Sequence, residues 1–164
     1  MNAIKPAYKG LITGLLMIAA TLFSYFILKN PIESNFQLLV YGIFTAGIIW
    51  SLIAHFNTDK LDYSFKAFFN IGFKTFIVVT LLMAIFTWIY FYYQPAFRDA
   101  KIAENSKLIV QQGDHTLQEI KQNEQKLKDI FLPMMVSGAV FRYLIIGALI
   151  SAVGAGFLSK KKNG

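Results

Sequence analysis

Three ionisable residues are the best candidates for chemistry in this 164-residue chain: Arg142, Lys74 and His55. Each stands inside or beside a long run of apolar residues, where a charge is costly to bury in lipid and marks a functional site by default. A guanidinium, an ammonium and an imidazole gathered among apolar helices would suit the passage of an ion or a small solute. The three residues therefore favour, as one hypothesis, a small transporter or channel component.

Arg142 also has an interpretation without a function. It lies about one helical turn inside the outer edge of the last apolar run, so its long side chain can snorkel to the lipid headgroups. The other interpretation is a buried polar cluster, in which Asp99, Glu104 or Asp129 would supply the carboxylate. We favour snorkelling for Arg142, and we expect His55 to be an interfacial residue rather than a proton relay.

The sequence carries no signal of an enzyme. It has no Cys and two His, and no Asp or Glu occurs inside the first three apolar runs. Thiolate metal sites, zinc-peptidase spacing and a paired-carboxylate metal site therefore cannot be assembled. Gly154-Ala-Gly156 lacks the strand and the pattern of a nucleotide-binding loop. We predict no catalytic residue, no metal ligand and no cofactor.

The elements that must position these residues follow from the apolar runs. Residues 10–28, 36–56 and 75–93 contain no Asp, Glu, Lys or Arg, and residues 130–159 contain Arg142 alone. A helix needs roughly twenty residues to cross a hydrocarbon core of about 30 Å. We predict an all-α integral membrane four-helix bundle, with spans at about 10–28, 36–56, 71–93 and 134–158.

The first run also resembles the core of a cleaved signal peptide. It is longer than the usual core of about 7–15 residues, and it ends at Ile27-Leu28-Lys29 without a small-x-small cleavage site. We therefore expect this run to be retained as the first span. The whole chain, residues 1–164, is then expected to be a single membrane domain.

Composition agrees with a membrane protein. Hydrophobic residues make up 55% of the chain and charged residues 15%, whereas a soluble domain carries roughly a quarter charged residues. The net charge is +7, and eight basic residues fall on the side of the termini against Lys29 alone in the short first connection. Lys and Arg are enriched in cytoplasmic loops, which predicts a membrane protein with both termini in the cytoplasm. The scattered basic residues do not suggest nucleic-acid binding.

The connection over residues 94–132 is polar and is expected to form a helical hairpin outside the membrane. Gly113-Asp114-His115 divides it, and Thr116 followed by Glu119 fits a capping box at the start of the second helix. One interpretation is a solvated hairpin, which we favour. The other is an element that binds a partner outside the membrane.

The third span is preceded by an amphipathic segment. Asp62 and Ser64 offer capping side chains, and Lys66, Asn70 and Lys74 stand four residues apart on one helical face. Apolar residues on one side and Lys on the other are typical of a helix at the membrane surface. Simple anchoring is the favoured interpretation, and a lipid or effector site is the alternative.

Small residues predict close helix contacts, because they let helix backbones approach one another. They recur at every fourth residue in three of the runs. The candidates are Gly10, Gly14, Gly42, Ala46, Gly147, Ser151 and Ala155. These residues could pack the bundle or join two copies of the chain, and the sequence does not choose between the two uses.

The chain resembles a family of bacterial membrane proteins, the domain-of-unknown-function 4199 family, seen mostly in Bacteroidota. The likeness rests on the segment from Tyr8 to Gly14 and on Ser64-Phe65, Ala67-Phe68 and Gly72-Phe73 before the third span. The resemblance implies a four-helix inner-membrane protein. It brings no activity, so Ser64, Phe65, Phe68 and Gly72 are motif residues without an assigned role.

The leading hypothesis is a non-enzymatic integral membrane protein that acts as a scaffold or an accessory subunit. Its expected partners are the lipid bilayer and either another membrane protein or a second copy of the chain. The alternative is the small transporter or channel component that uses Arg142, Lys74 and His55.

Overall fold

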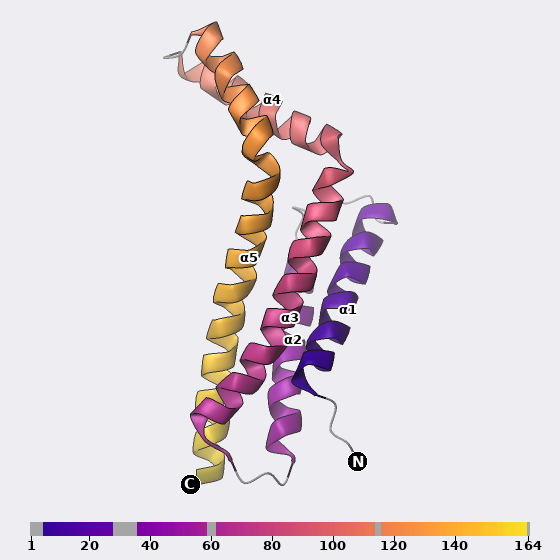
Figure 1. The fold of residues 1–164 in the computed structure, drawn as a ribbon, viewed down its shortest axis with the longest axis vertical. Coiled ribbons are helices and arrows are strands. Elements are labelled where there is room, and N and C mark those ends of the chain that lie inside the picture. The colour runs from indigo at the N-terminus through magenta and orange to yellow at the C-terminus, as the bar shows by residue number, and fades with distance from the viewer. Residues whose placement is uncertain (1–4, 28–35, 59–61, 114–115, 164) are drawn as a thin grey trace. The chain divides into compact units, whose positions relative to one another are not determined.

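A computed structural model describes residues 5–27, 36–58, 62–113 and 116–163 of the chain (Figure 1). Every element in these residues is an α-helix. The helices are α1 (Pro6–Phe26), α2 (Gln37–Phe56), α3 (Phe65–Tyr92), α4 (Pro95–Gln112) and α5 (Leu117–Asn163). The prediction of an all-α helical bundle is confirmed.

Four of the helices are long and apolar enough to cross a membrane. They are α1, α2, α3 and the part of α5 from Leu117 to Lys161. Together they indicate a multi-pass membrane protein. The first helix begins at Pro6, ahead of the predicted start at Gly10, because Pro at the first helical position already has helical φ and lacks the N–H that would be unsatisfied there.

The fifth helix differs from the expectation of a separate hairpin helix and final span. It runs without interruption over 47 residues and contains Pro133 in its interior. Proline removes one hydrogen bond and leaves the carbonyl four residues earlier, that of Asp129, without its usual donor. Asp129 is exposed, so water can satisfy that carbonyl and the helix continues.

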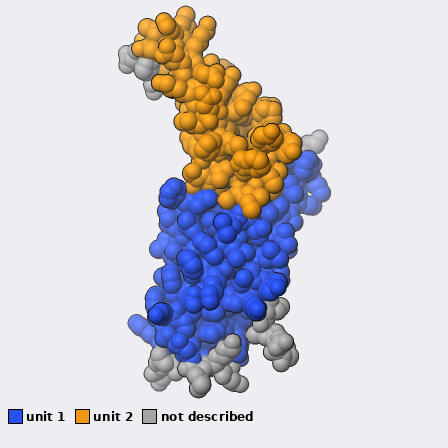
Figure 2. Space-filling view, in the orientation of Figure 1, with its two compact units in different colours: residues 1–83, 140–164 blue, residues 84–139 orange. Residues whose placement is uncertain are grey.

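The chain divides into two compact units (Figure 2). Unit 1 comprises residues 1–83 and 140–164, and unit 2 comprises residues 84–139. The division falls within α3 and α5, so it does not coincide with the ends of the predicted segment 94–132. We describe each unit by itself.

Unit 1 is held together by close approaches of glycines to neighbouring helices. A Cβ added at any of these glycines would lie less than 3.0 Å from an atom of another helix. Gly10 lies against Thr75, Gly14 against Leu82, Gly47 against Thr13, Gly72 against Ser151, Gly147 against Phe76 and Gly154 against Leu52. These contacts join α1 with α2 and α3, and α5 with α2 and α3. Glycine is required where the neighbouring atom belongs to a backbone, as at Gly10 against the Thr75 carbonyl, because a larger residue there would separate the two backbones.

The interior of unit 1 is filled by large apolar side chains. Phe44, Phe68 and Ile48 are completely buried, and Met17 and Val79 lie among them. Many other apolar side chains point away from the protein, among them Leu16, Leu38, Leu81, Ile145, Leu149 and Phe157. A water-soluble monomer rarely exposes so much apolar surface, so this arrangement fits a bundle whose solvent is lipid.

Unit 2 is a helical hairpin whose turn is defined by local interactions. Gly113 ends α4 with a φ of 76°, a conformation that glycine adopts without strain. At the start of α5, the Thr116 amide donates to the Glu119 carboxylate at 2.7 Å, and the Glu119 amide donates to the Thr116 hydroxyl at 3.3 Å. The predicted capping box is confirmed. The aromatic rings of Phe91, Phe97 and Phe131 pack together within the unit.

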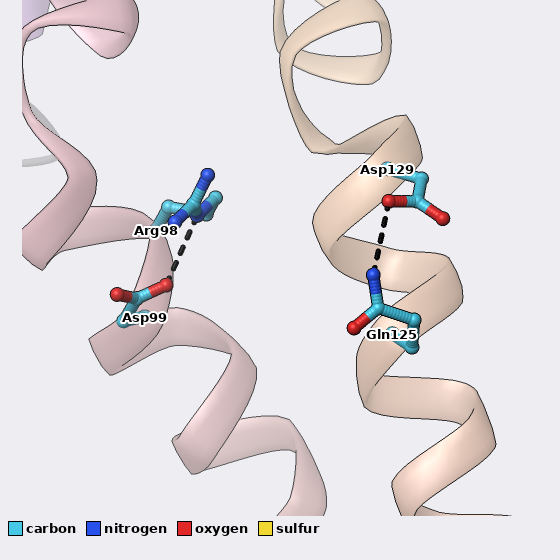
Figure 3. A network of polar contacts seen from close by, with 4 residues as sticks. All are labelled: Arg98, Asp99, Gln125 and Asp129. Atoms are coloured by element: carbon cyan, nitrogen blue, oxygen red, sulfur yellow. Dashed lines mark hydrogen bonds and ion pairs between the residues drawn. The ribbon is translucent and has the colours of Figure 1, made fainter.

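The surface of the hairpin carries polar pairs that stay within single helices (Figure 3). On α4 the Arg98 guanidinium donates to Asp99 at 3.0 Å, and on α5 the Gln125 amide donates to Asp129 at 3.2 Å. Exposed pairs of this kind contribute at most about 1 kcal/mol. They stabilise their own helices and do not dictate how the two helices pack.

We expect Gly47→Ala to destabilise unit 1. The new methyl group would meet the side chain of Thr13, which is stiff because it is β-branched and because its hydroxyl donates to the Lys9 carbonyl at 2.8 Å. Overpacking of this kind lowers the free energy of unfolding by about 1–3 kcal/mol. The change can be measured by unfolding the purified protein in mixed micelles with a denaturing detergent, followed by circular dichroism.

Gly42→Ala is the matched control on the same helix. Gly42 is exposed, and nothing would lie within 4 Å of its added Cβ. The control should unfold like the native protein or be stabilised by up to about 1 kcal/mol through helix propensity. Equal destabilisation by the two changes would contradict the packing described here.

Candidate functional site

A buried layer of polar residues crosses unit 1. We call it the polar layer; its members are Lys9 of α1, Ser51 of α2, Thr75 of α3 and Ser151 of α5, and each is at most 5% exposed. The four helices run in alternating directions, so these residues meet at one level of the bundle. Unit 1 also buries the hydroxyls of Thr13, Thr21 and Thr80, each of which donates to a carbonyl of its own helix.

Thr75 is the centre of the polar layer. Its hydroxyl lies 2.7 Å from the Ser51 hydroxyl, 3.0 Å from the Ile71 carbonyl and 3.3 Å from the Pro6 carbonyl. One hydroxyl donates a single proton and has two acceptor lone pairs. It can therefore accept from Ser51 while it donates to a carbonyl, and this arrangement connects α2, α3 and the beginning of α1.

Ser151 occupies the other side of the layer. Its side chain is fully buried and lies against Gly72, one turn before Thr75 on α3. Among the described residues, no donor or acceptor lies within hydrogen-bonding distance of its Oγ. A buried hydroxyl without a partner costs about 1–3 kcal/mol, so Ser151 is here because it fits against Gly72 rather than because it bonds there.

Lys9 is buried although it is only the fourth residue of α1. Its side chain is 5% exposed, and its ammonium lies 5.6 Å from the centre of the Trp50 ring. A desolvated cation over a tryptophan face gains about 2 kcal/mol. Sequence reasoning placed Lys9 among the basic residues outside the first span, and only the packing of α1 on α2 reveals its burial.

His55 belongs to an aromatic cluster one turn beyond Ser51 on α2. Its ring meets the edge of Phe68 at a centroid distance of 5.3 Å, and Phe68 also lies beside Phe56 and Tyr63. The Lys161 ammonium lies 5.9 Å from the Phe56 ring. The half-buried position of His55 is that of a packing residue at one end of the bundle.

Arg142 and Lys74 are exposed, and the structure does not bring them together with His55. Ser151 lies level with Gly72, so Arg142 stands nine residues beyond that level and Lys74 only two. At 1.5 Å per residue, Arg142 and Lys74 are roughly 10 Å apart along the bundle axis. Tyr143 turns into the core against Phe44, which directs the preceding Arg142 outward.

The carboxylates that the sequence offered to Arg142 have partners in their own helices. Asp99 accepts from Arg98, Glu104 from Lys101, and Asp129 from Gln125. Among the residues described, no three His, Asp or Glu side chains gather where they could hold a metal ion.

The motif residues of α3 each have a structural place. The Ala67 amide donates to the Ser64 hydroxyl at 3.2 Å, which makes Ser64 the N-cap of the helix. Phe68 is completely buried, and Gly72 lies against Ser151. Phe65 is 48% exposed and stacks on Phe69 at a centroid distance of 5.9 Å.

Comparison with known families agrees with this geometry. A family model described as a protein of unknown function (DUF4199) matches residues 8–160. The chain belongs to the DUF4199 family. The resemblance to this family is thereby confirmed. No curated protein and no solved structure matches the chain.

The predicted packing residues of this DUF4199 chain lie in two different environments. Gly10, Gly14, Gly147, Ser151 and Ala155 are buried within unit 1. Gly42 and Ala46 are exposed on α2, where Gly47 makes the close contact instead. Sequence reasoning missed Gly47 because spacing at every fourth residue does not reveal which neighbouring face meets another helix.

Some predicted features lie outside the described residues. They are Lys29, Lys60, Asp114, His115 and the side chain of Lys162.

A shallow groove of about 370 Å³ occurs on unit 2 and is lined by Ile109, Glu119, Ile120, Gln122, Asn123 and Lys126. The groove holds one residue of each charge and no group of convergent catalytic side chains.

We expect a measurable coupling between Ser51 and Thr75. In a double-mutant cycle with Ser51→Ala and Thr75→Val, the loss in the double variant should be smaller than the sum of the single losses. The difference should be about 0.6 kcal/mol, the average for hydrogen bonds between membrane helices. The free energy of unfolding in mixed micelles is the quantity to measure.

Thr80→Val is the control for this cycle. Thr80 is buried on the same helix, but its hydroxyl donates to the Phe76 carbonyl of α3 at 2.9 Å. The pair Ser51→Ala and Thr80→Val should be additive. Coupling of the same size in both cycles would mean that the Ser51–Thr75 bond does not carry the effect.

We also expect the Asp62 carboxyl to titrate below its ordinary range. Hydrogen bonds from the Ser64 side chain and backbone amide favour the carboxylate and lower the pKa of Asp62. Folding lowers this pKa, so the ionised carboxylate adds stability to the α3 cap. That added stability is complete above about pH 3.9, the ordinary pKa of aspartate, and is lost as the pH falls through the lower pKa of the folded state. Carbon NMR of the labelled carboxyl measures the titration.

Ser64→Ala should return the Asp62 titration toward about 3.9, the value of an unperturbed aspartate. Ser106→Ala is a suitable control because Ser106 lies on α4 of unit 2. An Asp62 titration that is unchanged by Ser64→Ala would show that Ser64 is not the cause of the shift.

Proposed function

We propose that this DUF4199 chain is a non-enzymatic integral membrane protein of the bacterial inner membrane that serves as a scaffold or an accessory subunit. The observation that carries the proposal is the closely packed interior of unit 1. Phe44 and Phe68 are fully buried, Phe76 is 2% exposed, and glycines bring the helix backbones together. A closely packed interior of this kind favours a scaffold for other proteins over a transporter, which would need a hydrated path.

The positions of the ionisable residues support the same proposal. A transporter that used Arg142, Lys74 and His55 would need these side chains to line a common cavity. Arg142 and Lys74 are exposed on their helices, and His55 packs edge-on against Phe68. Their separation favours a scaffold over the transporter hypothesis.

The hydroxyls of the polar layer do not resemble a catalytic group. The Thr75 hydroxyl lies within hydrogen-bonding distance of two backbone carbonyls and of the Ser51 hydroxyl, and Ser151 lies against Gly72. A serine or threonine nucleophile needs an adjacent general base that takes its proton. The bonds of Thr75 therefore support a role in helix association, and we propose that the protein has no enzymatic activity.

The distribution of lysines supports cytoplasmic termini. Lys5 precedes α1, Lys66 and Lys74 lie near the beginning of α3, and Lys160 and Lys161 lie at the end of α5. In an antiparallel bundle these positions share one end. The positive-inside rule places such an end in the cytoplasm, and the hairpin of unit 2 is then periplasmic.

The hairpin of unit 2 offers a surface for a partner. Three apolar side chains near its turn are more than half exposed: Leu108, Val110 and Leu117. Leu117 is the most exposed of the three, at 78%. We propose that an accessory role uses this surface to hold another membrane protein or a second copy of the chain.

The test is a crosslinking pull-down from native membranes. A photo-reactive amino acid placed at Leu117 should give a discrete crosslinked band that contains one membrane protein or a second copy of this chain. The same amino acid at Glu104, which is exposed on α4 of the same unit, is the matched control and should give at least about fivefold less of that band. Mass spectrometry of the band identifies the partner.

The proposal fails if the pure protein has an activity of its own. Purified protein in liposomes that moved a solute, with the movement abolished by Arg142→Ala, would establish the transporter hypothesis instead. Crosslinking that is equal at Leu117 and Glu104 would show that the hairpin has no specific partner and would also count against a scaffold role.

A further inference from the structure

The first turns of α3 present two exposed rows of residues that lie side by side. One row consists of Lys66, Asn70 and Lys74, and all three side chains are exposed. The other row consists of Phe65, Phe69 and Phe73, in which Phe65 is 48% exposed, Phe73 is 43% exposed and Phe69 is half-buried. Each member of one row follows a member of the other by one residue, a rotation of about 100°.

The opposite side of these turns packs into the bundle, which keeps the two rows on the outer surface of α3. The remaining side of the same turns is occupied by Phe68, which is completely buried, and by Gly72, which lies against Ser151. A Cβ at Gly72 would collide with the Ser151 side chain, so α3 packs against α5 through this face. The lysine row and the phenylalanine row cannot rotate into the bundle without breaking this contact.

The lysine row carries positive charge that no ion pair offsets among the described residues. Neither Lys66 nor Lys74 forms an ion pair with a carboxylate among the described residues. Asp62, the nearest acidic residue along the chain, accepts a hydrogen bond from the Ser64 amide at 3.0 Å. Lys160 and Lys161 at the end of α5 add positive charge to the same unit. Among the described residues here, the four lysines outnumber the one carboxylate, Asp62, so the net charge is positive.

We propose that the lysine row and the phenylalanine row form a binding site for an anionic phospholipid. The Lys66 and Lys74 ammonium groups hold the headgroup phosphate, and Phe65 and Phe73 contact the beginning of the acyl chains. Charge complementarity selects an anionic headgroup over a zwitterionic one. The exposed phenylalanines beside the lysines select a lipid over a free phosphate, which has no apolar part for them to cover.

The test uses the full-length protein in a neutral detergent. Phosphatidylglycerol should raise its thermal unfolding temperature, whereas phosphatidylcholine and soluble glycerol phosphate should not. The double variant Lys66→Gln, Lys74→Gln should bind phosphatidylglycerol roughly 25-fold more weakly, because each lysine near an anionic surface contributes about fivefold to affinity. Raising the salt concentration should weaken native binding, because exposed charges are screened.

The matched control is Lys121→Gln, Lys126→Gln, which removes two exposed lysines from α5 in unit 2. It should keep the native response to phosphatidylglycerol. A second variant, Phe73→Ser, leaves both lysines in place and should reduce lipid binding while it leaves binding of glycerol phosphate undetectable. Circular dichroism and the unfolding temperature in phosphatidylcholine verify that each variant is folded.

The outcomes separate the possibilities. Equal loss of binding in the two lysine variants would show that only the overall charge of the protein matters, and it would contradict the proposed site. Stabilisation by glycerol phosphate equal to that by phosphatidylglycerol would show a phosphate site without a lipid and would also overturn it. The result does not depend on a protein partner, so it stands apart from the crosslinking test of the scaffold role.

Discussion

The structure depends on one constraint: in lipid, apolar burial cannot drive helices together, because the lipid tails are as apolar as the side chains. Helices must instead approach closely enough to gain van der Waals contact. In unit 1 that approach occurs at glycines, as where Gly10 meets the backbone of Thr75 and Gly47 meets Thr13. Phe44 and Phe68 then fill the space between the contacts. Because one added methyl would open such a contact, the bundle is rigid.

The polar layer follows from the same constraint. A hydroxyl in an apolar interior must find a partner nearby, and the closest acceptors are backbone carbonyls of its own helix. Thr13 and Thr21 bond to carbonyls four residues earlier, and Thr75 reaches Ser51 as well. Close backbones make that reach possible. The Ser51–Thr75 bond therefore links α2 to α3, while charges such as Lys66, Lys74 and Arg142 stay on the surface.

The two units differ in the kinds of residue that they expose. Unit 1 exposes large apolar residues such as Leu16 and Phe157, whereas α4 exposes charged residues that pair within the helix. Their division within α3 and α5 means that neither helix has one environment along its length. A continuous α5 through Pro133 joins a polar beginning to an apolar end. The proposed lipid and partner surfaces lie on different units, so each can be altered without the other.

Much of the fold was predictable from the sequence because its signals are local. Apolar runs of roughly twenty residues, the caps at Ser64 and Thr116 and the turn at Gly113 are each decided by neighbours in the chain. Contacts between helices are not local. The repeat on α2 offered Gly42 and Ala46, yet the helix meets α1 at Gly47, one residue further and about 100° around. Likewise the burial of Lys9 beneath Trp50, and the outward position of Arg142, exist only once the faces of neighbouring helices are known. The sequence by itself determined which segments are helical and apolar enough to enter lipid, and the tertiary structure decided which side of each helix is buried, because that choice depends on the shapes of the other three.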